Sequence, residues 1–139
     1  MRRVIISTII CLLATTSFAA ESFNTAAKEP ITTKSGLQYT SIQEGTGATP
    51  GPTDTVRVNY RGTLVNGREF DSSYRNGRPA EFQLGNVIKC WTEGLQMMKV
   101  GGKAKLVCPS NIAYGDDGIP GSVPRFATLI FEVELLDIR

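Results

Sequence analysis

The sequence predicts an α+β domain in which an antiparallel sheet of five or six strands wraps around one short helix. Most apolar residues between positions 34 and 139 alternate with polar ones, which is typical of strands with one buried face. One stretch breaks this alternation, because Trp91, Leu95 and Met98 are spaced i, i+4 and i+7. Gly101 and Gly102 end that helical pattern. A single helix among many strands is expected to pack on one face of the sheet.

The clearest strand covers residues 55–61 (TVRVNYR), where every second residue is apolar. Asn66 and Gly67 follow it and favour a tight type I′ turn, which would return a second strand in a hairpin. Shorter or later strands are expected at residues 37–42, 81–84, 103–108 and 129–135. A loop rich in Gly, Pro, Asp and Ser covers residues 109–127. Loops longer than about 12–15 residues are uncommon in compact domains and are usually functional, so we expect the site there.

The N-terminal residues have the pattern of an export signal. Met1, Arg2 and Arg3 give a positive start, residues 4–14 are apolar, and residues 17–19 (SFA) place small side chains at the cleavage site. We therefore expect a signal peptide at residues 1–19, a flexible leader at 20–33 and a folded domain at 34–139. The alternative is a membrane anchor, but the apolar run is well short of the roughly 20 residues that span a bilayer. We expect no membrane association after cleavage.

The composition excludes several functions. The chain has no histidine, which rules out Ser-His-Asp and Cys-His catalysis and zinc sites with imidazole ligands. Removing Arg2 and Arg3 from the 15 basic residues leaves 13, which equals the number of acidic residues. A domain with equal numbers of basic and acidic residues and no basic run is not expected to have a basic face for nucleic acid. We expect no nucleic-acid partner, no cofactor and no metal.

Two cysteines remain after the expected cleavage, Cys90 and Cys108. Cys108 has the same strand parity as Leu106 and is expected to face the core, while Cys90 precedes Trp91 at the start of the helix. Export places the chain where disulfides persist, so a Cys90–Cys108 disulfide is possible. The alternative is a pair of buried free thiols.

Five blocks of sequence together resemble the FKBP-type peptidyl-prolyl cis-trans isomerases. They are residues 58–62 (VNYRG), 70–73 (FDSS), 87–88 (VI) with Trp91, 113–115 (AYG) and 127–136 (ATLIFEVELL). The blocks occur in the family's order, and the resemblance runs from about Lys34 to Arg139. The resemblance implies a sheet wrapped around a short helix, with an aromatic pocket between them. This agrees with the fold expected from the residue pattern.

The resemblance also implies which residues form the site. The expected catalytic residues are Asp71, Tyr114 and Phe131. The expected substrate-binding residues are Tyr60, Phe70, Val87, Ile88, Trp91, Ile119 and Val123, with Trp91 as the pocket floor. The chain departs from the family at Ala80, where many members carry an aromatic side chain, and at Asn76, where several carry an arginine that contacts the pocket acid. One wall should therefore be lower, and Asp71 less tightly held.

The activity that this resemblance implies is rotation about X-Pro peptide bonds in newly exported proteins, which requires neither a nucleophile nor a metal. The expected partners are unfolded or proline-containing polypeptides, and macrolide inhibitors such as tacrolimus and rapamycin. We expect an exported monomer, located in a bacterial periplasm. Two alternatives remain: a binding module that holds peptides in the same cleft without turnover, and an inert secreted domain whose core is filled.

Overall fold

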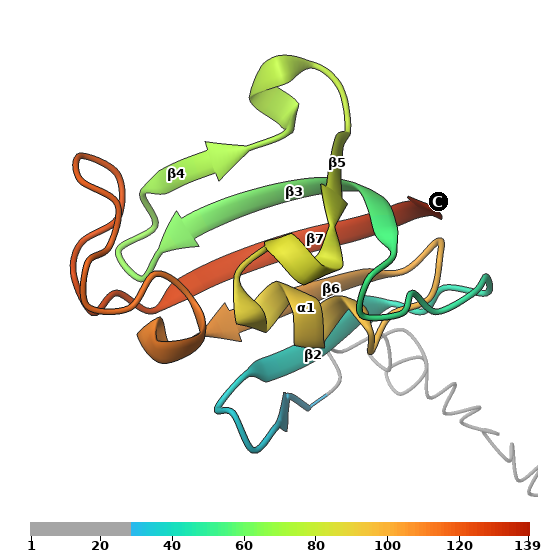
Figure 1. Ribbon diagram of the computed structural model, residues 1–139, viewed down its shortest axis with the longest axis horizontal. Coiled ribbons are helices and arrows are strands. Elements are labelled where there is room, and N and C mark those ends of the chain that lie inside the picture. The colour runs from blue at the N-terminus through green and yellow to red at the C-terminus, as the bar shows by residue number, and fades with distance from the viewer. Residues whose placement is uncertain (1–28) are drawn as a thin grey trace, which may run out of the picture.

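A computed structural model describes residues 29–139, so the predicted signal peptide and most of the predicted leader lie outside the described residues. The strands are β1 (Ile31–Thr32), β2 (Gln38–Gln43), β3 (Thr55–Leu64), β4 (Glu69–Ser72), β5 (Ala80–Gln83), β6 (Lys103–Cys108) and β7 (Leu129–Ile138). The α-helix is α1 (Lys89–Leu95), and the short 3₁₀ helices are η1 (Tyr74–Asn76), η2 (Leu84–Asn86) and η3 (Ser110–Ile112). Figure 1 shows α1 lying across the sheet.

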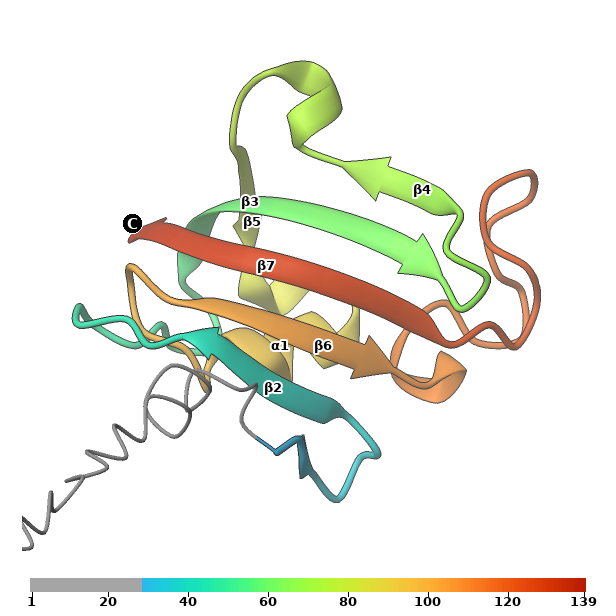
Figure 2. The ribbon, with the colours of Figure 1, turned by 180° about the vertical axis from the view of Figure 1, so that it is seen from behind.

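All strands pair antiparallel in the order β1-β2-β6-β7-β3-β4, and β5 also pairs with β3. Helix α1 covers one face of this sheet, and Figure 2 shows the opposite face with β7, β6 and β2 in front of the helix. The predicted α+β architecture is confirmed. The structure adds a seventh strand, β1, in the segment expected to be a flexible leader. Both side chains of β1 are exposed, so the sequence has no alternation there that could reveal it.

The core lies between α1 and the sheet because the apolar residues of β3 and β7 point toward the helix. Val56, Val58 and Tyr60 are buried on β3, whereas Arg57 between them is exposed. The helix packs closely on β6, because Gly94 has no side chain to keep the two apart. A Cβ atom at Gly94 would lie 2.9 Å from both methyl groups of Leu106. This close contact sets the distance between the helix and the sheet.

The helix is shorter than its apolar spacing predicts. It ends at Leu95, and the next turn is tightened by bonds from Met97 N–H to the Gly94 carbonyl and from Met98 N–H to the Leu95 carbonyl. Met98 is still buried, at 2% exposed. The predicted apolar face is therefore present, with its last residue in a turn rather than in the α-helix. Among residues 29–139, no helix has the length and apolar character needed to cross a bilayer.

The hairpin between β3 and β4 does not use the predicted type I′ turn. That turn needs positive φ at both central residues, but only Gly67, at φ 88°, has it in this segment. Gly67 N–H donates to the Leu64 carbonyl at 2.9 Å, and Leu64 N–H donates to the Arg68 carbonyl at 2.9 Å. These bonds define a three-residue loop in which Gly67 takes the left-handed position.

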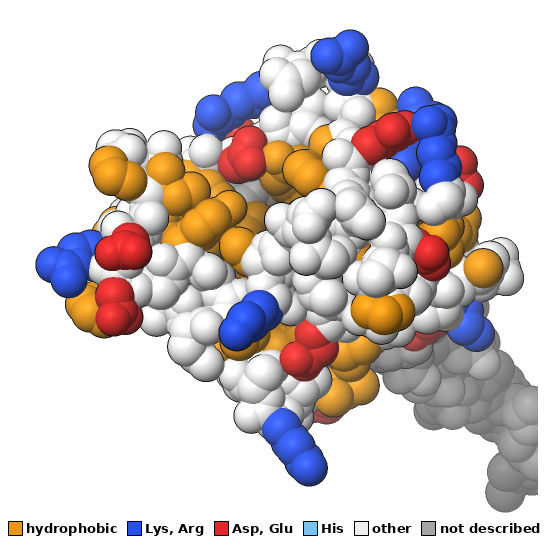
Figure 3. Space-filling view, viewed as in Figure 1, with side chains coloured by type: hydrophobic (Ala, Val, Ile, Leu, Met, Phe, Trp, Pro, Cys, Tyr) orange, Lys and Arg blue, Asp and Glu red, His pale blue; other side chains and the backbone are white. Residues whose placement is uncertain are grey.

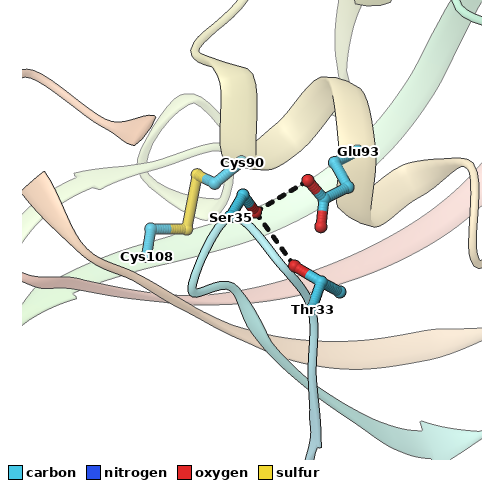
Figure 4. Close-up of a disulfide and its surroundings, with 5 residues drawn as sticks. All are labelled: Thr33, Ser35, Cys90, Glu93 and Cys108. Carbon is cyan, nitrogen blue, oxygen red and sulfur yellow. Dashed lines mark hydrogen bonds between the residues drawn. A yellow bond between two sulfur atoms is a disulfide. The ribbon is translucent and has the colours of Figure 1, made fainter. Parts of the chain in front are cut away.

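Cys90 and Cys108 are joined in a disulfide that ties the start of α1 to the end of β6 (Figure 4). Their Cα atoms are 5.8 Å apart, and both residues are fully buried. Beside the disulfide, the Ser35 hydroxyl donates to Glu93 Oε2 at 2.8 Å. The turn between β1 and β2 is thus fastened to the same helix.

Candidate functional site

An open hollow of about 280 Å³ lies between α1, the sheet and the loop that follows η3. It is lined by Tyr60, Asp71, Phe82, Asn86, Val87, Ile88, Trp91, Tyr114 and Phe131. Figure 3 shows hydrophobic side chains gathered on this face, between β4, helix α1 and the loop before β7. The hollow is large enough for a small apolar ring and remains open to solvent on one side.

Trp91 forms the floor of the hollow together with Tyr60 and Phe131, which are its neighbours on β3 and β7. The ring centroid of Trp91 lies 5.0 Å from that of Tyr60 and 5.4 Å from that of Phe131, with nearly perpendicular planes. These three residues, called the floor below, are only 4%, 7% and 3% exposed in the order Trp91, Tyr60, Phe131. Such edge-to-face packing fixes the indole plane. The Trp91 Nε1 atom is buried and has no hydrogen-bond partner among the described residues.

Two polar residues, Asp71 and Tyr114, stand at the mouth of the hollow and are called the rim below. Asp71 lies in β4, and its Oδ2 accepts a 2.7 Å hydrogen bond from the Tyr60 hydroxyl. Its Oδ1 accepts a bond from Ser72 N–H at 2.9 Å. Asp71 is thus held by Tyr60, not by a residue at position 76. Asn76 lies in a different hollow.

Burial and the neighbouring Asp71 keep both tyrosines neutral. Burial raises the pKa of Tyr60, and the hydrogen bond to Asp71 raises it further. Burial also raises the pKa of Tyr114, with a smaller effect from the Asp71 charge. A phenol that stays protonated keeps its O–H available as a donor. Tyr60 already donates to Asp71, so the Tyr114 hydroxyl is the donor that an incoming ligand could use.

The backbone around Tyr114 is fixed by short-range bonds to η3. The Ala113 and Gly115 N–H groups both donate to the Ser110 carbonyl, at 3.0 and 2.8 Å. Gly115 takes a positive φ of 59°, a conformation that glycine adopts without steric cost. The tyrosine is therefore presented by a defined turn within the long loop that the sequence singled out.

Three expected binding residues do not line this hollow. Phe70 packs against Phe131 instead, with ring centroids 5.6 Å apart. This packing needs Gly62, because a Cβ atom there would lie 2.7 Å from Phe70 and 2.8 Å from Phe131. Phe70 therefore packs against a floor residue instead of lining the hollow.

Ile119 and Val123 lie at the tip of the long loop and bond to each other. Their backbone N–H and carbonyl groups exchange two 2.8 Å hydrogen bonds, which close the tip on itself. Both side chains border another hollow together with Arg68, whose Nη2 donates to the Ser122 carbonyl at 2.7 Å. The loop tip is thus directed toward the β3–β4 hairpin rather than over the floor.

Two residues that line the hollow were not among the expected site residues, Phe82 and Asn86. Phe82 packs edge-on against Tyr60 at 5.7 Å and Trp91 at 5.4 Å, and so supplies a wall. The sequence did contain a signal for Phe82, because it alternates with Glu81 and Gln83 on a predicted strand. Asn86 lies in η2, for which no periodic pattern exists.

No group of three His, Cys, Asp or Glu side chains in the described part of the chain is placed to hold a metal ion. The hollow instead offers aromatic walls, one carboxylate and one free phenol hydroxyl. This arrangement suits a neutral, ring-shaped apolar group with a nearby carbonyl oxygen.

The chain belongs to the FKBP-type peptidyl-prolyl cis-trans isomerase family, whose model matches residues 47–136. It is 52% identical over 108 residues to the FKBP-type peptidyl-prolyl cis-trans isomerase FkpA of Escherichia coli (strain K12), covering 78% of this chain and 40% of the relative. It is 51% identical over 114 residues to the FKBP-type 22 kDa isomerase of the same strain, covering 81% and 55%. The chain thus spans about half or less of the length of these curated relatives.

Solved structures show the same fold. The crystal structure of FkpA from Escherichia coli matches with a TM-score of 0.78 and 47% identity, covering 85% of this chain and 55% of that one. The crystal structure of AtFKBP13 matches with a TM-score of 0.75 and 32% identity, covering 81% of this chain and all of that one. The family expected from the five sequence blocks is confirmed.

Proposed function

We propose that this protein accelerates the cis-trans isomerisation of X-Pro peptide bonds in exported, unfolded polypeptides. The observation that carries this proposal is the open hollow above Trp91, with its aromatic walls and its polar rim. Membership of the isomerase family supports the same activity.

The chemistry requires only that the amide rotate. Rotation about an X-Pro bond has a barrier near 20 kcal/mol because amide resonance is lost as the bond twists, and unaided it takes tens to hundreds of seconds. No covalent bond is broken, so a catalyst needs to hold the twisted form better than the planar one. The planar amide has greater charge separation than the twisted amide. An apolar wall solvates the planar amide less well than water does. This reduces the free-energy difference between the planar and the twisted amide.

Each part of the site has a role in this scheme. The proline ring lies on the Trp91 indole, between Phe82 and Phe131, where it is held in one orientation. The Tyr114 hydroxyl donates to a carbonyl oxygen of the substrate and keeps the flanking chain still while the bond turns. Asp71, positioned by Tyr60, is directed at the twisting amide. Val87 and Ile88 complete the apolar lining.

The partners follow from this chemistry. Proline-containing polypeptides without stable structure are the proposed substrates, and macrolides such as tacrolimus and rapamycin are proposed to compete for the same hollow. A bacterial periplasm is the proposed location, supported by the export pattern of residues 1–19 and by the disulfide.

A protease-coupled assay on short X-Pro peptides tests the proposal. We expect the wild-type protein to accelerate isomerisation, and Asp71→Ala, Tyr114→Phe and Phe131→Ala each to slow it. Peptide binding with isomerisation no faster than in buffer would instead support a binding module that holds chains in the cleft. A wild-type rate in all three variants would show that the site is assigned to the wrong residues.

A further inference from the structure

A second hollow lies in the segment that connects β4 to β5. Its volume is about 480 Å³, and it is lined by Arg57, Asn76, Arg78, Pro79, Ala80 and Glu81. None of these residues lines the hollow above Trp91. Figure 3 shows blue Lys and Arg side chains around the top of the view, where this segment lies. We call this second site the arginine hollow.

Strand β5 contributes to both hollows, because Phe82 lines the one above Trp91 and Ala80 and Glu81 line the arginine hollow. Ala80 and Phe82 are two residues apart on β5, so their side chains point to the same face. Phe82 fills its position with a ring that packs on Tyr60 and Trp91. Ala80 has only a methyl group at the corresponding place. Ala80 and Asn76, the two departures noted in the sequence, both line the arginine hollow.

Several arginines of this region are already paired with carboxylates. Arg61 Nε and Arg75 Nε both donate to Glu69, at 2.6 and 2.8 Å. Arg139 Nη1 lies 3.0 Å from Oε1 of Glu81, the carboxylate that borders the arginine hollow. These pairs leave Glu69 and Glu81 occupied.

Arg57 and Arg78 are different, because within residues 29–139 neither makes an ion pair with a carboxylate within 4.0 Å. Asp137 lies opposite Arg57 on β7, but its Oδ1 accepts a bond from Ile138 N–H at 2.9 Å. The lining of the arginine hollow contains two arginines, Arg57 and Arg78, and one carboxylate, Glu81, which already pairs with Arg139. The arginine hollow therefore has an excess of positive charge and unused donors.

These donors match an oxyanion. A guanidinium has a planar fork of N–H groups that fits a carboxylate with two parallel hydrogen bonds, and the Asn76 amide adds further donors. Because the arginine hollow adjoins a site proposed to bind polypeptide, an anion arriving on the same chain is an Asp or Glu side chain.

We propose that the arginine hollow is a specificity subsite, which binds an acidic side chain of the substrate close in sequence to the proline above Trp91. This inference rests on the proposed isomerase function and names a substrate class for it. Ala80 and Phe82 are separated by about 7 Å along β5, at roughly 3.3 Å per residue. The acidic residue is therefore expected two or three positions from the proline.

A peptide series tests this subsite. Each peptide has the same X-Pro core, with one Glu at a position one to four residues before or after the proline, and a matched peptide has Gln there. The ratio of kcat/KM for the Glu peptide to that for the Gln peptide is the readout. At the favoured position we expect a ratio of about threefold to fivefold, the size typical of a solvent-accessible ion pair. Added salt should reduce it.

The double variant Arg57→Gln with Arg78→Gln should remove the preference while leaving turnover of the Gln peptide unchanged, because it removes the positive charge of the arginine hollow. It should bring the ratio close to one. Lys105→Gln is the matched control, because it removes an exposed charge on β6, which borders neither hollow. It should retain the wild-type ratio.

A ratio of one at every position in the wild type, or a ratio that survives in the double arginine variant, would overturn the subsite. Failure of the proposed function has a different signature, since neither peptide would then be isomerised faster than in buffer. In that case NMR titration of the protein with the two peptides still decides the question. Tighter binding of the Glu peptide that depends on Arg57 and Arg78 supports the arginine hollow, and equal binding refutes it.

Discussion

The floor and the rim of the hollow are built in different ways. The floor residues Tyr60, Trp91 and Phe131 lie in regular elements and are at most 7% exposed, so they are also core residues. The rim residues belong to the short strand β4 and to the long loop, and Tyr114 is 36% exposed. Substitutions in the floor should therefore lower both stability and turnover, whereas substitutions in the rim should change turnover with little effect on stability.

Trp91→Ala should have the largest effect and is the strongest test of the floor. Truncating a buried aromatic residue costs about 3–5 kcal/mol in unfolding free energy, and here it also removes the surface on which we propose that proline rests. Urea denaturation and the isomerase assay measure the two losses. A variant that lost turnover but kept wild-type stability would show that Trp91 is not part of the core.

The disulfide connects the floor to the start of the long loop, because Cys90 precedes Trp91 and Cys108 precedes η3. The double variant Cys90→Ala with Cys108→Ala should be about 3 kcal/mol less stable, since the bond closes a loop with a sequence separation of 18. Urea denaturation measures this loss by comparing the double variant with the oxidised wild type. The wild type under reducing conditions, which has both cysteines but no bond between them, is the control. Equal stability of the double variant and the oxidised wild type would contradict a bonded pair.

Tyr60 is buried and its hydroxyl bonds to Asp71, which joins the floor to the rim, and both effects predict a dependence of stability on alkaline pH. The pKa of Tyr60 is raised above 10.0 in the folded state, so above pH 10 the unfolded state loses its proton first. Its contribution to stability is therefore complete below about pH 10 and falls as the pH rises. Tyr60→Phe should be less stable at neutral pH but lose less stability between pH 9 and 11.

Urea denaturation at pH 9, 10 and 11 measures this difference. Tyr74→Phe is the matched control, because Tyr74 is exposed and lies outside the hollow. The same alkaline slope in Tyr60→Phe and wild type would show that folding does not raise the pKa of Tyr60.

Tyr114→Phe is the corresponding test of the rim. It should slow isomerisation by about threefold to tenfold, the value of one hydrogen bond to the substrate. Its unfolding free energy should stay within about 0.5 kcal/mol of wild type, as for most surface substitutions. Steady-state kinetics and urea denaturation check the two values. A large loss of unfolding free energy would contradict this, because it would show that Tyr114 contributes to the core.

Phe126 gives the smallest expected effect and lies in the same loop, beyond the rim. It is 61% exposed, and its φ of 58° is unusual for an aromatic residue. Phe126→Asn should stabilise the protein by about 0.5–1 kcal/mol, because asparagine tolerates this conformation better. Turnover should not change, since Phe126 does not line the hollow. Thermal unfolding measures the change in stability, and a lower melting temperature for Phe126→Asn would contradict the predicted stabilisation.

The difference between floor and rim also explains what the sequence could predict. Residues such as Val58, Trp91 and Phe131 repeat with the period of a strand or helix, because burial selects apolar residues at regular spacing. Rim positions such as Asp71 and Tyr114 have no such period, and only the resemblance to a family indicated them.

Other features depended on contacts that spacing does not encode. Ile119 and Val123 pair with each other at the loop tip, which turns their side chains toward Arg68. The β3–β4 turn uses three residues because only Gly67 takes positive φ. The arginine hollow depends on which arginines are already paired with carboxylates.

The most direct measurement of the central claim is the cis-trans exchange rate of an X-Pro peptide at equilibrium, followed by NMR exchange spectroscopy with a catalytic amount of protein. We predict exchange well above the buffer rate, blocked by an excess of tacrolimus and greatly reduced in Trp91→Phe. Exchange at the buffer rate, while the peptide shifts the signals of the residues around Trp91, would contradict the claim that this hollow turns the prolyl bond.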